Sequence, residues 1–353
     1  MHAVVHRPGK HLALAGPAGA VAATVGQGKA GVEGGAQQSL ALVDGKLMAA
    51  GLYRDLVRHQ TILSNTLHMR ILIVGCGDVG LRAARLLRGH ARLYALARSR
   101  ERHDELRAAG VTPIGGDLDD RKSLARIAAL ADRVLHFAPP PTEGETDPRT
   151  KRLLAALGRA SLSVSLVYIS TSGVYGDCSG AVVPETWPSR PNNTRAKRRA
   201  DAEARLRRFG SGGPRVSILR APGIYAQDRM PAERVKKGLP AILAKDDVYT
   251  NHIHADDLAR LAVTALFRGR PNRLYNAVDD SGLKMGDWFD VVADHLDLPR
   301  PPRLSRAEVI AAVTPAMRTF LTESRQLSNR RIKKELSFQL RYPTVREGLK
   351  HQG

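Results

Sequence analysis

The sequence predicts an α/β protein built on a doubly wound parallel sheet, with a smaller α/β lobe at its C-terminal end. Two observations predict this class. From residue 71 to residue 219, short continuous apolar runs alternate with segments that have helical spacing. Such runs are typical of strands buried on both faces, as in parallel sheets. A glycine-rich turn at residues 75–80 also joins the first strand to the first helix.

Six strands and five helices account for this alternation, and we expect right-handed crossovers between them. The expected strands are 71–74, 93–97, 111–114, 134–137, 165–170 and 216–219. The expected helices are 79–87, 101–109, 121–131, 148–159 and 195–209. After residue 221 the pattern changes to short strands with helices near 255–267, 285–296 and 305–313. We therefore expect a cofactor-binding domain at 69–225 and a substrate lobe at 226–353, partly interleaved with it.

The composition is that of a soluble globular protein, with 43% hydrophobic and 25% charged residues among 353. It contains no stretch of about 18 apolar residues, which argues against a membrane-spanning helix. Two cysteines cannot form a disulfide framework, so we expect a reducing, cytoplasmic location. The 55 basic residues outnumber the 34 acidic ones, but they are scattered. We expect neither a nucleic acid nor a membrane as partner, and a bound phosphate group would suit the charge.

Residues 1–68 differ from the rest of the chain. They are rich in Gly and Ala and show no long periodic segment, whereas Met69 directly precedes the first apolar run. We interpret 1–68 as a non-native or disordered N-terminal extension, with Met69 as the natural start. A secretory signal with an apolar segment at 12–24 is the alternative, and Pro17 weakens it.

The turn at 75–80 fits the dinucleotide-binding pattern G-x-G-x-x-G in the required strand–turn–helix context. Gly75 would permit the tight turn, Gly77 the approach of a pyrophosphate, and Gly80 close packing of helix on strand. Asp78 and Val79 lie in the first helical turn, whose N–H groups and dipole attract phosphate. The sequence therefore predicts a dinucleotide cofactor.

The end of the second strand indicates which dinucleotide. An NAD site places an acidic residue there for the ribose 2′-hydroxyl. This chain has Arg98 and Arg100, and no acid before Glu101. Arg98 can pair with a 2′-phosphate, so NADP is favoured over NAD, although a solvated pair of arginines is the alternative.

Two further strand ends are expected beside the cofactor, because ligands of such sheets bind at the carboxyl ends of the strands. Asp117 and Leu118 follow the third strand, and Ala138 and Pro139 follow the fourth. Asp117 could accept a hydrogen bond from the adenine amino group, or it could simply cap a loop or helix.

From Met69 to about residue 350 the chain resembles an extended short-chain dehydrogenase/reductase of the NAD-dependent epimerase/dehydratase superfamily, which has a Rossmann fold. Besides the glycine turn, the resemblance rests on four segments: Gly116-Asp117-Leu118, residues 167–176 (VYISTSGVYG), residues 219–225 (LRAPGIY) and residues 251–257 (NHIHADD). The tail at 328–349 resembles one atypical bacterial subgroup. The resemblance implies that Thr171 or Ser172 orients a substrate oxygen and that Pro222 lies on the nicotinamide side.

One departure from the family pattern affects the chemistry. The family uses a Tyr-x-x-x-Lys pair on the helix after the fifth strand, with Tyr as the acid/base. Residues 191–203 contain no Tyr. Aligning on Lys197 puts Asn193 in the Tyr position, whereas aligning on Glu203 puts Arg199 in the Lys position and Arg195 in the Tyr position.

Other groups could replace the missing tyrosine or its lysine. Tyr175 and Tyr225 are candidate acid/base phenols, and each could equally be a packed core residue. Lys197 could bind the cofactor ribose, or it could lie on a solvated helix face and pair with Asp201.

Several polar residues are interpreted as structural. His252 and His254 with Asp256 and Asp257 match a helix start capped by an Asp, so no metal site is expected. The helix N-terminus should lower the pKa of Cys76 somewhat, without a redox role. The basic helix at 195–208 lacks aromatics and should be a solvated face.

Two function classes follow. The first is an NADP-dependent oxidoreductase or epimerase-like enzyme for a small-molecule substrate, with Arg234, Lys236 and Lys237 as candidate contacts for a substrate diphosphate. The second is a catalytically inactive dinucleotide-binding sensor or scaffold. The basic helix would repel its copy in a symmetric pair, so we expect a monomer or a weak homodimer.

Overall fold

The computed structural model describes residues 69–159 and 164–350, together with four short strands earlier in the chain. Those four, β1 (Ala13–Leu14), β2 (Val21–Ala22), β3 (Leu40–Val43) and β4 (Lys46–Ala49), form an antiparallel sheet in a unit that spans Met1–His68. The remainder of residues 1–68 lies outside the described residues, and so does the expectation about their origin. The second unit is Met69–Gly353.

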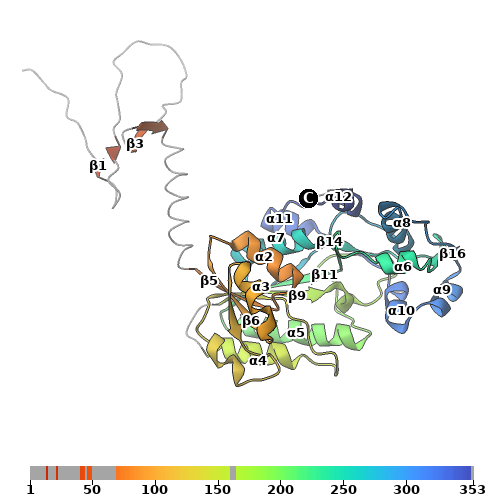
Figure 1. Ribbon diagram of the computed structural model, residues 1–353, viewed down its shortest axis with the longest axis horizontal. Helices are drawn as coiled ribbons and strands as arrows, with labels where there is room; N and C mark the ends of the chain where they lie inside the picture. The colour runs from red at the N-terminus through yellow and green to blue at the C-terminus, as the bar shows by residue number, and fades with distance from the viewer. Residues whose placement is uncertain are drawn as a thin grey trace, which may run out of the picture. The chain divides into compact units, whose positions relative to one another are not determined.

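The centre of the second unit is a parallel sheet of seven strands (Figure 1). Its order is β15-β11-β9-β8-β5-β6-β7, so the chain reverses its direction of winding between β5 and β8. The predicted doubly wound α/β class is confirmed. The strands are β5 (Arg70–Val74), β6 (Arg92–Ala97), β7 (Val111–Gly115), β8 (Arg133–His136), β9 (Ser165–Thr171), β11 (Arg215–Ala221) and β15 (Arg273–Asn276).

Helices cover both faces of this sheet (Figure 1). Alternate residues of β5 point to opposite faces, with Ile71 and Ile73 in one core and Leu72 and Val74 in the other. The first core also takes side chains from α2 (Asp78–Leu87), α3 (His103–Ala108), α7 (Ala255–Arg268) and α11 (Arg330–Leu336). The second takes them from the 3₁₀ helix η2 (Ser123–Ile127), α4 (Pro148–Leu157) and α5 (Thr194–Ser211).

Three elements differ from the sequence prediction. The helix expected at 121–131 is only the short η2. The helix expected to end before Gly210 continues to Ser211, and a Cβ on Gly210 would overlap the present position of the Asn272 side chain. The seventh strand, β15, is not among the predicted strands, because a pattern of four residues is too short to distinguish a strand from other structure.

The C-terminal lobe has its own core, formed around Tyr225, Trp288, Phe289, Val292 and Val309. Its helices are α6 (Ala232–Lys236), α8 (Met285–His295), α9 (Arg306–Ala312), α10 (Pro315–Thr322) and α12 (Val345–Lys350). Pairs of short parallel strands complete it: β12 (Gly223–Tyr225) with β14 (His252–His254), and β13 (Ala241–Ile242) with β16 (Arg303–Leu304). A third pair, β10 (Val182–Val183) with β17 (Gln326–Leu327), joins it to the loop after β9.

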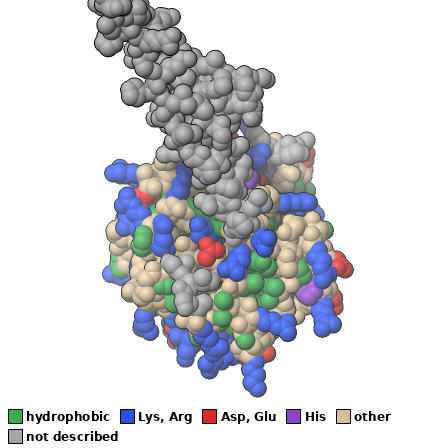
Figure 2. Space-filling view, turned by 90° about the vertical axis from the view of Figure 1, so that its left-hand side faces the viewer, with side chains coloured by type: hydrophobic (Ala, Val, Ile, Leu, Met, Phe, Trp, Pro, Cys, Tyr) green, Lys and Arg blue, Asp and Glu red, His purple; other side chains and the backbone are tan. Residues whose placement is uncertain are grey.

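Basic side chains are dispersed over the face shown in Figure 2 and do not form a single tract. Within the described part of the chain, no helix combines the length and the apolar character that a membrane span requires.

Candidate functional site

The carboxyl ends of the seven parallel strands lie at one edge of the sheet, and the predicted site residues follow these ends. The glycine turn follows β5, Arg98 follows β6, and the pairs 117–118 and 138–139 follow β7 and β8. Thr171 ends β9, and Pro222 follows β11. The topology therefore places residues that are distant in sequence along one edge.

The three glycines of the turn have different surroundings. Gly75 has a φ of +87°, and a Cβ there would overlap the backbone of Ala138. A Cβ on Gly80 would lie 3.0 Å from the Gly75 carbonyl oxygen and 3.4 Å from Ile73 Cγ2. Gly77 has nothing within 4 Å of that position. The turn is thus open only at Gly77, at the start of α2, which fits the approach of a pyrophosphate.

An acidic residue stands at this phosphate-attracting helix start. Asp78 accepts hydrogen bonds from Arg82 Nε and from Arg229 Nη1, both at 2.6 Å. Burial acts to raise the pKa of Asp78, but the two guanidinium groups outweigh it and hold that pKa below its usual range. Arg82 also bonds Asp256 at 2.6 Å and Asp228 at 3.3 Å. Arg229 comes from the loop after β12, so this cluster ties that loop to the glycine turn. Val79, the next residue of α2, is buried.

Three arginines lie around the β6 end of the site. Arg98 and Arg100 are exposed, directly after β6. Arg102, in the 3₁₀ helix η1 (Arg100–Arg102), donates through Nη2 to the carbonyl oxygen of Cys76 at 2.9 Å. Arg102 is not among the predicted site residues, although it stands four residues after Arg98 in the same basic run. Of these three arginines, it is the one that bonds to the glycine turn.

The residues after β7 and β8 are held by local contacts. Asp117 is half-buried, and its Oδ1 accepts from the Asp119 backbone N–H at 2.9 Å, which is a loop-capping interaction. Leu118 is buried in the second core. Ala138 is buried against Gly75, and its N–H donates to the Val74 carbonyl at 2.9 Å, whereas Pro139 is exposed.

The expectation for Cys76 was wrong in direction. The thiol is buried, and burial raises its pKa to about 11, which the nearby Arg102 only partly offsets. Desolvation is the largest cause of the shift, and the buried residue is an inert small side chain beneath the turn.

A cavity of about 910 Å³ adjoins the ends of β9 and β11, with Thr171, Ser172 and Pro222 in its wall. The wall continues through the start of α5, through β12 and β14, and through α8 and α10. Cavities of this size hold small molecules.

The two candidate hydroxyls differ in their availability. Thr171 Oγ1 accepts from the Gly173 N–H at 3.2 Å and caps the 3₁₀ helix η3 (Ser172–Tyr175). Ser172 is buried, and its hydroxyl bonds to no described residue. Ser170 points elsewhere, since its hydroxyl donates to Glu203 at 2.6 Å. Ser172 is thus the hydroxyl best placed to bind a ligand.

Neither candidate tyrosine presents its hydroxyl to the cavity. Tyr175 is fully buried, does not line the cavity, and donates to Asn276 Oδ1 at 2.8 Å. Tyr225 lines the cavity with its ring, but its hydroxyl donates to the Thr344 carbonyl at 3.2 Å. Burial raises the pKa of both phenols. Both geometries argue against an acid/base role.

Lys197 does not line the cavity. It pairs with Glu145 at 2.6 Å and not with Asp201 as predicted, because Asp201 pairs with Arg205. Arg195 and Asn193 do line it. Glu203 is buried and binds Arg220 through both carboxylate oxygens. Arg199 reaches back to β9, where Nη1 donates to the Ile169 carbonyl at 2.7 Å. The residues that the two alignments put in the Tyr position, Asn193 and Arg195, thus both lie in the cavity wall, and neither alignment is excluded.

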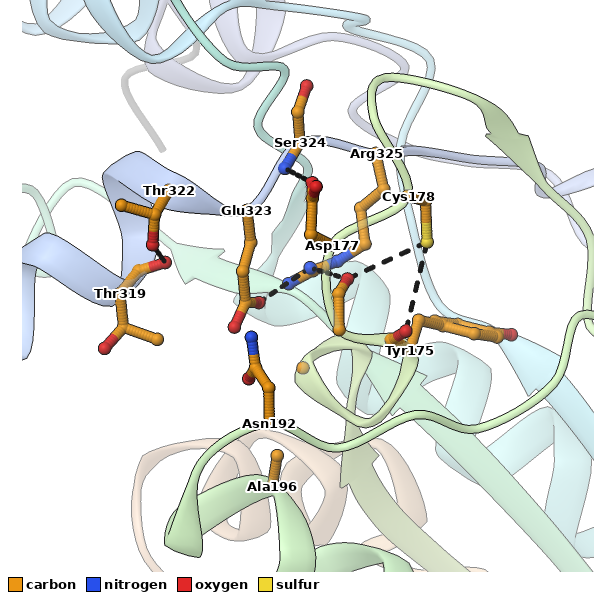
Figure 3. Close-up of polar contacts among 12 residues, drawn as sticks. Tyr175, Asp177, Cys178, Asn192, Ala196, Thr319, Thr322, Glu323, Ser324 and Arg325 are labelled. Carbon is orange, nitrogen blue, oxygen red and sulfur yellow. Dashed lines mark hydrogen bonds and ion pairs between the residues drawn. The ribbon is translucent and has the colours of Figure 1, made fainter. Parts of the chain in front are cut away.

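The C-terminal segment contributes charged groups that sequence reasoning missed. Glu323 is buried in the cavity wall and accepts from Arg325 Nη1 at 2.7 Å (Figure 3). Arg325 also donates to the Gly176 carbonyl at 2.6 Å. The segment is fixed where the Ser324 N–H donates to Asp177 Oδ1 at 2.7 Å. At the start of α5, Asn193 Nδ2 donates to Glu323 Oε1 at 3.5 Å. The two residues are 130 positions apart in sequence, so no local pattern indicates this contact.

The two histidines of residues 252–254 have different roles: His254 caps a helix, and His252 lines the cavity. His254, and not an Asp as expected, caps α7, since its Nδ1 accepts from the Asp256 N–H. His252 lines the cavity against Trp288, with ring centroids 4.5 Å apart. Burial lowers the pKa of His252 to about 3, so the ring is neutral. No three potential metal-binding side chains gather within residues 69–159 and 164–350.

The parallel sheet, its reversal of winding and the glycine turn define a Rossmann-fold dinucleotide-binding protein. Residues 75–268 match the family model described as NAD(P)H-binding, and the chain belongs to this family. A nicotinamide dinucleotide is accordingly its class of cofactor.

The chain is also similar to one curated relative and to several solved structures. The chain is 29% identical over 248 residues to an uncharacterized protein of Schizosaccharomyces pombe, across 65% of this chain and 82% of the relative. A functionally unknown conserved protein from Silicibacter pomeroyi has a TM-score of 0.67 at 29% identity, covering 80% of this chain and 97% of that one. The dTDP-glucose 4,6-dehydratase DesIV of Streptomyces venezuelae, solved with NAD bound, has a TM-score of 0.64 at 21% identity over 80% and 94%. The resemblance to epimerases and dehydratases is thus confirmed for the fold.

Proposed function

We propose that this protein is an NADP(H)-dependent oxidoreductase that moves a hydride between the nicotinamide and a carbonyl or carbinol carbon of a small molecule. The observation that carries the proposal is the cavity of about 910 Å³ that opens from the ends of β9 and β11. A protein that only senses a dinucleotide needs no cavity of this kind beyond its cofactor site.

The residues of the cavity wall would have the following roles in the reaction. A bound nicotinamide supplies a hydride to a carbonyl carbon or takes one from a carbinol carbon. Ser172 would donate a hydrogen bond to the reacting oxygen. Reduction also requires one proton at that oxygen, and oxidation releases one. Two wall groups can exchange it: the phenol of Tyr249, whose hydroxyl bonds to no described residue, and the carboxylate of Glu323.

The preference for NADP is inferred from charge at the end of β6. Arg98 is exposed there, Arg102 contacts the glycine turn, and no acidic residue stands where a ribose 2′-hydroxyl would be bound. Calorimetric titration with NADPH and NADH tests this. Arg98→Asp should weaken NADPH roughly tenfold or more and leave NADH little changed. Arg126→Asp, an exposed change on η2, is the control of equal charge. Equal loss in both variants, or no binding of either dinucleotide, would contradict the proposal.

A catalytically inactive sensor is the second candidate, because residues 191–203, where the family tyrosine is expected, contain no Tyr. Ser172→Ala distinguishes the two. In an enzyme this change should lower turnover about a hundredfold and leave NADPH affinity unchanged. Turnover is followed as loss of NADPH absorbance. Ser211→Ala, an exposed change at the end of α5 and outside the cavity wall, is the control.

A further inference from the structure

The wall of the cavity is mainly apolar on the side of the C-terminal lobe. Tyr225, Met230, Trp288 and Phe289 line it there, and Phe320 on α10 lies at its rim, half-exposed. Such a wall favours an aromatic or branched apolar body in the ligand. These side chains offer few partners for the hydroxyls of a sugar ring, although Thr250 and Thr319 also line the cavity.

Four charged side chains line the cavity, and three of them are compensated. Glu323 and Arg325 bond each other at 2.7 Å (Figure 3). Arg229 bonds Asp78 at 2.6 Å, within a cluster where the three carboxylates exceed the two guanidinium groups. These pairs leave little charge for a ligand.

Arg195 is the exception among the cavity-lining residues that the structure describes. It has no hydrogen-bond or ion-pair partner, and the charged groups that act on it are Arg199 and Arg198. Desolvation at the cavity wall and these two neighbours lower its pKa, which means that the site lacks a counter-charge. The residue is exposed to solvent and lines the cavity, so an anionic ligand can reach its guanidinium.

Arg195 is also close to the proposed chemistry. It lies in the first turn of α5, and that turn packs on the end of β9, where a Cβ on Gly173 would lie 4.0 Å from Ala196 Cβ. Ser172 lines the same cavity. A ligand in this cavity can therefore contact both Ser172 and Arg195.

We propose that the substrate is a small carboxylic acid with its carboxylate next to the reacting carbon, a 2-oxo or 2-hydroxy acid with an aromatic or branched apolar body. Arg195 binds the carboxylate, and the apolar wall holds the body. One uncompensated guanidinium matches one carboxylate, whereas a nucleotide diphosphate would need more cations. The inference rests on the proposed oxidoreductase function, because that function fixes where the reacting carbon lies.

The test compares phenylpyruvate with phenylacetone, a ketone in which a methyl group replaces the carboxylate. Calorimetry on the full chain with NADPH present should show phenylpyruvate binding roughly ten- to a hundredfold more tightly. Arg195→Gln should remove this difference and leave phenylacetone unaffected, and Arg195→Lys should retain part of it. Arg207→Gln, an exposed change on the same helix, is the control.

Three results would overturn the inference: equal affinity of the wild type for both probes, equal loss in Arg207→Gln, or tighter binding of UDP-glucose than of phenylpyruvate. If Arg195→Gln does not fold, the salt dependence of wild-type binding decides, since only phenylpyruvate should weaken with ionic strength. Oxidation of NADPH is recorded separately. Arg195-dependent binding of phenylpyruvate without oxidation would contradict the proposed function and leave the carboxylate site standing.

Discussion

Gly75 and Gly77 are two residues apart, yet a methyl group has opposite consequences at the two positions. At Gly75 the positive φ and the Ala138 backbone both exclude a Cβ. Gly75→Ala should therefore lower the free energy of unfolding by more than about 2 kcal/mol. Gly77→Ala, with open space around it, should cost less than about 1 kcal/mol but weaken dinucleotide binding tenfold or more. Urea unfolding and calorimetry separate the two effects, and normal cofactor affinity in Gly77→Ala would contradict this account.

Asp279 is a buried carboxyl outside the cavity wall that should make stability depend on pH. Burial raises its pKa to about 7 from an ordinary 3.8, so the fold prefers the protonated form. The cost of ionising it grows as the pH rises from about 4 through 7, to at most about 4 kcal/mol. Asp279→Asn should therefore gain stability relative to wild type as the pH increases. Urea unfolding at pH 5, 6.5 and 8 checks this, and a constant difference would be inconsistent with it.

At the scale of elements, a buried ion pair joins one helix to two strands. Glu203 on α5 accepts from Arg220 on β11 at 3.0 and 2.7 Å and from Ser170 on β9 at 2.6 Å. Glu203→Ala leaves the Arg220 charge buried without its partner and should cost about 3–5 kcal/mol. Chemical unfolding measures the loss. The double change Glu203→Leu with Arg220→Met should recover much of it, and no recovery would mean that the helix contacts, not the charge, set the cost.

The elements of the first half were predictable because buried parallel strands leave continuous apolar runs and the glycine turn has a fixed spacing. The length of the helix predicted at 121–131 was too great, because the short η2 is enough to bury the apolar residues that gave the helical spacing. Tyr175 follows a catalytic-looking strand end, but η3 turns its ring into the protein, toward Asn276. The cavity could not be predicted, because its wall joins 193–196, 222–231, 249–252 and 317–325, which only tertiary packing brings together.

At the scale of the molecule, the residues from Met69 onward contain the complete sheet and the hydrophobic cores of both the cofactor and the cavity regions. A chain starting at Met69 should therefore melt within a few degrees of the full chain and bind NADPH equally well. Scanning calorimetry and titration of the two chains compare them directly. A lower melting temperature or a weaker affinity in the shorter chain would show that residues 1–68 support the site.

The charge of +21 concerns the molecule as a whole. Its dispersal over the face in Figure 2 agrees with a solvated surface. Three points stay predictions: the protein is cytoplasmic, it is a monomer or weak homodimer, and it has no nucleic-acid or membrane partner.

The two cysteines have a practical consequence for following the site in solution. Both thiols are buried and burial raises the pKa of each, so neither reacts readily with iodoacetamide in the native protein. Alkylation must wait for local opening, and its rate then measures how often each segment opens. Cys76 reports on the glycine turn and Cys178 on the loop beyond β9. A ligand that protects the first thiol and not the second reveals its binding place by mass spectrometry, with no substitution in the chain.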